Sequence, residues 1–153
     1  HKEDRHMFRM LHGCERWGWV ILQLFFGFVF MMHGAQKLFG VMGGSGVTGL
    51  AGFFGKLGLE PALFWAWVVT IVEFFGGAFI FAGLFTRVCA ALLAIDMTVA
   101  ILKVHVPVGF FWLTPGGGSE FPLTLAVIAL TLVLSGPSFL SLDRLFGLEG
   151  RER

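Results

Sequence analysis

Seven polar side chains interrupt stretches of this sequence that are otherwise apolar, and their chemical types are those that bind ligands and move protons. Imidazoles and carboxylic acids can transfer protons, while ammonium and amide groups can hold an oxygen atom. His33, Glu73 and His105 are therefore our candidates for proton transfer, and the candidates for ligand binding are Gln36, Lys37, Asp96 and Lys103.

Helical spacing brings several of these residues onto common faces. His33 and Lys37 are four positions apart and therefore lie on one face of a helix, about 40° from each other. Asp96 and Lys103 are seven positions apart and also share a face. An ionisable group at the middle of a membrane span costs about 2.5–3.5 kcal/mol, so such groups usually pair or face a cavity. We expect a polar pocket, and the alternative is a structural ion-pair network that fixes helix register.

The composition indicates a membrane protein. Of 153 residues, 56% are hydrophobic and 14% are charged, and the mean hydropathy is +0.82. An average soluble domain has about 45–50% apolar and about 25% charged residues. The net charge of +1 gives no basic excess for a nucleic-acid partner. The two cysteines form no metal or redox motif, and we assign them no role.

Four apolar stretches are long enough to be read as membrane spans, which take about 20 residues each. The stretches cover residues 17–39, 62–85, 88–104 and 121–140, and Gly136 and Pro137 are expected to bend or end the last one. Only Thr86 and Arg87 join the second and third stretches, so these two are expected to be antiparallel neighbours. The predicted fold is all-α, a four-helix transmembrane bundle.

The distribution of basic residues predicts the orientation of this bundle. With four spans, both termini and the turn at residues 86–87 lie on one side. That side carries Lys2, Arg5, Arg9, Arg16, Arg87, Arg144, Arg151 and Arg153, while the other side carries Lys37, Lys56 and Lys103. Because Lys and Arg concentrate in cytoplasmic loops, we expect both termini in the cytoplasm and the bundle in the cytoplasmic (inner) membrane.

Two loops are then expected on the outer side. From Gly40 to Gly58 a glycine stands at every third position, with apolar residues at helical spacing between them. This pattern predicts a short interfacial or re-entrant helix in the first outer loop. The second loop, residues 105–120, contains Phe110, Phe111 and Trp112, which suit either an interfacial anchor or a lid over a pocket.

A polar pocket under aromatic side chains suits a quinone or quinol, which combines a polar head with an apolar tail. A b-type haem with His33 and His105 as axial ligands is the competing chemical interpretation, although the usual pairing of ligand histidines within single helices is missing. We find no motif for an intrinsic flavin, metal or iron–sulfur cofactor, so electrons are expected to come from a partner subunit that carries a cofactor.

Several segments in order resemble the DoxX family of small four-helix membrane proteins of bacteria and archaea. They are HGAQKLFG, GGSGVTGLAGFFGKLGLEPAL, VEFFGGAFIFAGLFTR, HVPVGFF and GGGSEFPLTLAVIALTLVLSGP, followed by SLD. The resemblance covers roughly residues 18–144 and depends on HGxxK, EFxGG, GLxTR and EFPL occurring together.

The resemblance implies membership in a family whose namesake is a small subunit of a thiosulfate:quinone oxidoreductase. By position in those motifs it implies roles for His33, Lys37, Glu73, Arg87, His105 and Glu120. Glu120 joins the ligand-binding candidates on this ground. Arg87, on the cytoplasmic side, is expected to anchor to lipid headgroups or to dock a partner.

These observations give one membrane domain at residues 17–142, flanked by a charged cytoplasmic tail at 1–16 and a cytoplasmic C-terminal tail at 143–153. The predicted function is a membrane subunit of a redox complex, in contact with lipid and with oxidoreductase subunits, that binds a quinone or a similar lipid-soluble ligand. The alternative is a non-catalytic accessory subunit whose polar cluster is structural. A small transporter or sensor is a third interpretation, but four spans without internal repeats argue against a complete carrier.

Overall fold

The structure, a computed structural model that describes residues 14–149, is helical throughout the described part and contains no strand there. The helices are α2 (Glu15–Phe39), α3 (Gly46–Lys56), α4 (Ala62–Ala82), α5 (Thr86–Ala100), the π-helical turn η1 (Ile101–His105), α6 (Glu120–Ser135) and α7 (Leu142–Leu145). The all-α fold predicted from the sequence is confirmed. Most of the predicted N-terminal tail lies outside the described residues.

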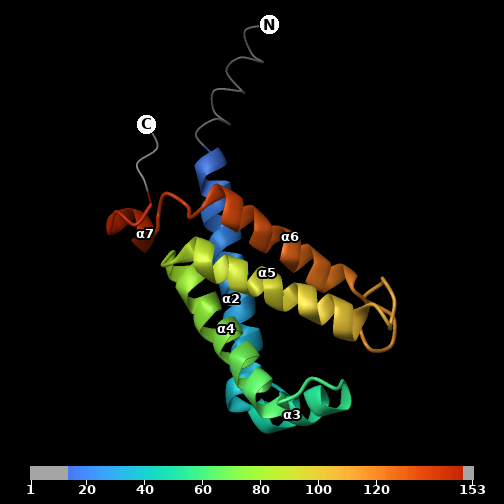
Figure 1. Cartoon of the computed structure of the whole chain (residues 1–153). Coiled ribbons are helices and arrows are strands. Elements are labelled where there is room, and N and C mark those ends of the chain that lie inside the picture. Colours follow the sequence, from blue (N-terminus) through green and yellow to red (C-terminus); the bar gives the residue numbers. More distant parts are fainter. Residues whose placement is uncertain (1–13, 150–153) are drawn as a thin grey trace, which may run out of the picture.

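The long helices form two antiparallel pairs that diverge. In Figure 1, α2 runs alongside α4, and α5 runs alongside α6 in a second pair that crosses the first at an angle. The pairs meet near the turn between α4 and α5. The start of α2, this turn and α7 lie at one end of the molecule, here called the α7 end. At the opposite, α3 end, α3 covers the first pair, and the loop between η1 and α6 lies at the far end of the second.

The lengths of the helices differ from the predicted spans. Of the helices in the described part, three are long and apolar enough to cross a membrane: α2, α4, and α5 continued by η1 from Thr86 to His105. The predicted fourth span ends at Ser135 instead of residue 140, because Gly136 takes a positive φ of 75° and Pro137 follows it. Its 16 residues extend only about 24 Å. Similarly, α4 ends at Ala82, where Gly83 has a φ of 68°.

Glycines allow α2 and α4 to approach closely. A Cβ atom at Gly34 would overlap with backbone atoms of Phe74, and one at Gly77 would overlap with the backbone of Met31. Small residues at such positions are a common means of packing helices in a membrane, where lipid offers no hydrophobic driving force for association. The first pair is therefore held together by backbone-to-backbone contact.

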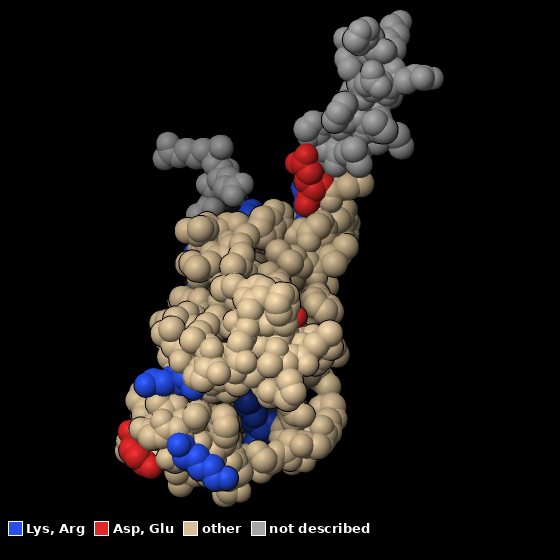
Figure 2. All heavy atoms as spheres, turned by 90° about the vertical axis from the view of Figure 1, so that its right-hand side faces the viewer, with Lys and Arg blue, Asp and Glu red and all other residues tan. Residues whose placement is uncertain are grey.

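The hydrophobic core lies where the two pairs cross. It contains the buried side chains of Phe26, Phe30, Ile80, Cys89, Ala90, Leu93, Met97, Leu125, Ala126, Ala129 and Leu132. Many large apolar side chains instead face outward, among them Phe64, Ile71 and Phe75 on α4. Figure 2 shows a middle region almost free of Lys, Arg, Asp and Glu, with charged residues near the two ends. This distribution fits a protein whose surrounding solvent is lipid.

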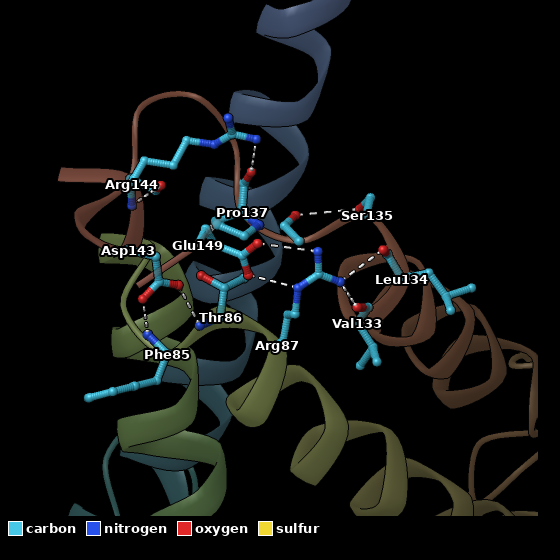
Figure 3. A network of polar contacts seen from close by, with 12 residues as sticks. Phe85, Thr86, Arg87, Val133, Leu134, Ser135, Pro137, Asp143, Arg144 and Glu149 are labelled. Carbon is cyan, nitrogen blue, oxygen red and sulfur yellow. Dashed lines mark hydrogen bonds and ion pairs between the residues drawn. The ribbon is translucent and has the colours of Figure 1, made fainter. Parts of the chain in front are cut away.

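At the α7 end, the chain after α6 packs against the helix ends instead of hanging free (Figure 3). Asp143 is 3% exposed, and its carboxylate accepts hydrogen bonds from the backbone N–H groups of Phe85 at 2.7 Å and Thr86 at 2.8 Å. These donors belong to the first turn of α5, which lacks intrahelical partners for them. Gln23, buried on α2, accepts a further hydrogen bond from the N–H of Ser138 at 2.7 Å.

The side chain of Arg87 is engaged within the fold rather than held out as an anchor or docking group. Its guanidinium donates to the carbonyl oxygens of Val133 and Leu134, the latter at 2.9 Å, at the C-terminal end of α6. It also donates to both carboxylate oxygens of Glu149, at 2.7 and 3.3 Å. Arg87 thus joins α5, α6 and the C-terminal segment, because the last carbonyls of a helix attract cationic groups.

We expect Asp143→Ala to lower the free energy of unfolding by about 2 kcal/mol, because two N–H groups at the buried start of α5 lose their acceptor. Asp143→Asn keeps one acceptor oxygen and should cost about half as much. Thermal unfolding of the purified variants in detergent measures both values. Equal stability of Asp143→Ala and the native protein would show that these hydrogen bonds contribute nothing.

Candidate functional site

A cavity of about 970 Å³ lies between the diverging helix pairs and extends toward the α3 end. Figure 2 looks at the side on which the pairs diverge, and Lys or Arg atoms are recessed there in a hollow in the lower part of the molecule. Most of the cavity wall is apolar, with Phe30, Val69, Val72, Met97 and Leu125 among its residues. The polar residues on the wall are His33, Lys37, Glu73, Asp96, Lys103 and His105, together with Glu60.

An ion pair between α2 and α4 lies at the centre of this wall. The ammonium of Lys37 bonds to Oε2 of Glu73, and Glu73 is 2% exposed. Asp96, on α5, interacts electrostatically with both Glu73 and Lys37. Two carboxyl groups therefore share one ammonium, and Oδ2 of Asp96 is buried with no hydrogen-bond partner. Lys37, Glu73 and Asp96, three of the seven polar residues singled out in the sequence, thus lie together and come from three helices.

Each histidine on the wall is held through one ring nitrogen. Nδ1 of His105 donates to the carbonyl of Gly117, and Nδ1 of His33 donates to the carbonyl of Val29, both at 2.8 Å. Because a carbonyl oxygen only accepts, the neutral form of each ring carries its proton on Nδ1. The two rings have different neighbours: His105 contacts the loop before α6, while the His33 ring lies 6.2 Å from that of Phe121 on α6.

The last turn of the third span is a π-helix, and it carries Lys103 and His105 to the cavity. The bond from the N–H of Val106 to the carbonyl of Ile101, at 2.8 Å, closes this wider turn. The wider turn changes the direction in which the following side chains point, and single π-turns are frequent at functional sites. Within the described residues, the structure gives Lys103 no ion pair.

Two predicted ligand-binding residues lie off the cavity wall. Gln36 donates through Nε2 to the carbonyl of Met42 at 3.1 Å and so supports the turn after α2. Glu120 accepts through Oε1 from the backbone N–H of Trp112 at 2.8 Å and so supports the loop before α6. Each side chain thus satisfies a nearby loop, and ligand binding by Gln36 and Glu120 stays a prediction.

The cavity wall also includes aromatic side chains, of which the sequence analysis considered only Trp112, as part of an anchor or a lid. Trp65 comes from α4, Trp112 from the loop and Phe121 from the first turn of α6. In the sequence, the only sign that these three aromatic residues could line a site is their position beside the outer loops. Gln23 was overlooked too, although a lone amide within an apolar run is a recognisable sign of a buried hydrogen bond.

The loop of residues 106–119 folds back toward the cavity because Glu120 holds it at two points. Besides the side-chain bond to Trp112, the N–H of Glu120 donates to the carbonyl of Phe110 at 2.9 Å. A Cβ atom at Gly118 would collide with the carbonyl oxygens of Phe110 and Phe111, so only glycine fits this fold of the loop.

Glu120→Ala should loosen this loop, because the N–H of Trp112 loses its acceptor. We expect amide hydrogen exchange across residues 109–118 to rise by about tenfold, as loss of one hydrogen bond permits. Glu120→Gln retains a side-chain oxygen and should exchange at nearly the native rate. Hydrogen exchange with mass spectrometry measures the effect, and unchanged exchange in Glu120→Ala would refute the supporting role of Glu120.

These features define an all-helical integral membrane protein with a polar cavity between two helix pairs. The family model named DoxX matches residues 18–106, more than half of the chain, and the protein belongs to the DoxX family. The match covers α2 to η1 and thus includes every polar group of the cavity wall described above.

Known relatives support this assignment. A Bacillus subtilis protein named "Putative oxidoreductase CatD" is 33% identical over 126 residues, which are 82% of this chain and 84% of that protein. A membrane protein of Mycobacterium tuberculosis is 34% identical over 148 residues, with 89% of this chain and 85% of that protein covered. A Haemophilus influenzae protein is 29% identical over 82% of this chain and 87% of its own. No solved structure matches significantly.

Proposed function

We propose that this DoxX-family protein is a membrane subunit of a redox complex and binds a quinone or a similar lipid-soluble molecule in the cavity between the helix pairs. The observation that carries the proposal is the cavity itself: about 970 Å³ of largely apolar volume into which charged and imidazole groups converge. Pockets for small ligands typically have about 300–1,000 Å³ and a few well-placed polar groups on an apolar wall.

Different residues of the cavity wall would contact the tail and the head of such a ligand. An isoprenoid tail would lie against Phe30, Val69 and Leu125, while the polar head would face the groups toward the α3 end. In this proposal His33, Glu73 and His105 exchange protons with the head group, and Lys37 and Lys103 hold its oxygen atoms. Asp96 balances the charge of the lysines.

Electrons have to come from another subunit, because no group suited to carry single electrons is evident in the chain. The name of the Bacillus subtilis relative, an oxidoreductase, agrees with this role. We further propose an inner-membrane location with both termini in the cytoplasm. Eight of the 11 Lys and Arg residues belong to the two terminal segments or to the turn between the second and third spans, the parts expected on the cytoplasmic side.

A second candidate function is that of an accessory subunit that stabilises a larger membrane assembly. The observation in its favour is that the Lys37–Glu73 pair joins α2 to α4 and would serve structure alone. The two functions differ in what His33→Ala and Glu73→Gln should do. A quinone subunit should lose electron transfer in an assembled complex, whereas an accessory subunit should lose assembly or stability.

The direct test is extraction of the protein with its surrounding lipid from native membranes, followed by quantification of bound quinone and mass spectrometry of copurifying proteins. We expect about one quinone per chain, together with an oxidoreductase that carries a cofactor. Val69→Trp should fill the cavity and release the quinone. Ile71→Trp is the matched control, because Ile71 lies on the same helix, is 47% exposed and points away from the cavity.

Each outcome has a distinct meaning. Quinone that is retained by Ile71→Trp but lost from Val69→Trp supports the cavity as the binding site. Equal retention in both variants places the quinone elsewhere and contradicts the proposal. An absorption spectrum of the same samples shows whether a Soret band follows this chain, which would favour a haem held by His33 and His105. A complex with neither ligand would leave the accessory function.

A further inference from the structure

The fold leaves several hydrogen-bond acceptors unpaired on the cavity wall. Both histidines use Nδ1 as the donor to a backbone carbonyl, so in each neutral ring Nε2 is the nitrogen with the lone pair. Within the described residues, the structure gives neither Nε2 atom a hydrogen-bond partner. The wall of one cavity therefore carries two imidazole acceptors.

A third acceptor belongs to the carboxylate cluster. Oδ2 of Asp96 is buried without a partner, although its residue lies on the cavity wall. The nearby ammonium of Lys37 is already bonded to Glu73. A buried carboxyl oxygen without a hydrogen bond is costly, so a donor on whatever fills the cavity would stabilise this atom.

Donors also lie on this wall, namely Lys37, Lys103 and the indole N–H groups of Trp65 and Trp112. Lys103 lies on the cavity wall at the π-helical turn, and its ammonium can only donate. A ligand that satisfies the wall has to donate to His33, His105 or Asp96 and still accept from Lys103. A carbonyl oxygen accepts but cannot donate, whereas a hydroxyl group does both.

Resting on the proposed function, we infer that the cavity selects the reduced, dihydroxy form of its ligand: an aromatic diol whose two hydroxyl groups donate to two of the three acceptors, which are Nε2 of His33, Nε2 of His105 and Oδ2 of Asp96. The oxidised dicarbonyl form fills the same apolar volume but leaves these acceptors unpaired. A site built to bond a hydroxyl group discriminates strongly against an analogue without it, because the buried partners are then left unsatisfied.

The test compares three probes of nearly equal shape on the purified full-length protein in detergent under anaerobic conditions. The probes are a benzoquinol with one isoprenoid unit, the corresponding quinone, and the dimethyl ether of the quinol, which cannot donate. Quenching of tryptophan fluorescence reports binding, because Trp65 and Trp112 line the cavity. We expect the quinol to bind at least about tenfold more tightly than the quinone and the ether.

Variants then locate the acceptors. His33→Asn and His105→Asn keep a side-chain N–H near the position of Nδ1 but remove Nε2, so the backbone bonds to Val29 and Gly117 can persist. Asp96→Ala removes both carboxyl oxygens and with them the third acceptor. The variants at the two acceptors in use should reduce the preference for quinol over quinone, with smaller changes in the affinity for quinone. Lys56→Gln, which alters an exposed residue of α3 off the cavity wall, should retain the full preference.

The results separate this inference from the function on which it rests. Equal binding of quinol and quinone would overturn the selection of the reduced form and leave the quinone-binding function intact. A quinol preference that survives in all three variants would also overturn the inference, since its acceptors would then lie elsewhere. Absence of binding by any probe to the folded protein would contradict the proposed function itself.

Discussion

Lys37→Met should lower the free energy of unfolding by about 3–5 kcal/mol, the usual cost of removing one partner from a buried ion pair. Glu73 is 2% exposed and is bonded to Lys37, so the substitution leaves it and the adjacent Asp96 in an apolar environment without a cation. The helices α2 and α4 also lose a polar link in the half of the molecule near α3. Unfolding of the purified variant in detergent measures the loss.

The double variant Lys37→Met with Glu73→Leu should recover most of this loss, because removal of both partners leaves no uncompensated charge. Lys56→Met is the control for a lysine that is exposed, and it should change stability by no more than about 0.5 kcal/mol. If Lys37→Met and Lys56→Met proved equally stable, the pair would not be buried as the structure has it.

Gly77→Ala should destabilise the protein by at least about 2–3 kcal/mol, the range for overpacking a tight interface. The added Cβ atom would overlap with the backbone of Met31 and of Gly27, so α2 and α4 would have to separate. Backbone atoms cannot rotate out of the way as a side chain can. Separation would also stretch the Lys37–Glu73 pair, because Glu73 lies one turn before Gly77 on α4. Unfolding in detergent again supplies the measurement.

Gly76→Ala, at the adjacent position on α4, is the matched control. Its Cβ atom would meet the side chain of Leu93 at 3.7 Å, which is ordinary van der Waals contact. Since alanine favours a helix over glycine by up to about 1 kcal/mol, this variant should be neutral or slightly more stable. A similar loss in both variants would mean that the close approach of α2 and α4 does not depend on Gly77.

The sequence predicted the helices well because helix formation in a membrane depends mainly on local hydropathy. The start of α4 at Ala62, the tight turn at residues 83–85 and the helix after Ser45 all lie close to the predicted positions. The predicted fourth span extends five residues beyond the end of α6, because the apolar character continues past Ser135, whereas the backbone breaks at Gly136. The divergence of the helix pairs could not be derived, since crossing angles follow from packing between distant segments.

The candidate site was predicted in part for the same reason. The high cost of ionisable groups in an apolar run identified Lys37, Glu73 and Asp96, and the structure brings these three together. The sequence could not reveal that the side chains of Gln36 and Glu120 bond to neighbouring loops, because those hydrogen bonds depend on how the chain turns next to each helix. The motif that contains Arg87 also could not show whether its side chain binds lipid headgroups or joins α5 to α6 and Glu149.

By itself the sequence determined that this is a helical membrane protein and which polar residues the membrane forces to find partners. Both are properties of composition along a single helix, where burial in lipid penalises each polar group locally. The tertiary structure decided which partner each group finds, which of two adjacent glycines is indispensable, and that a cavity opens between α4 and α5. Those outcomes depend on the relative rotation and crossing of helices, which steric contact between backbones sets only when the whole chain is packed.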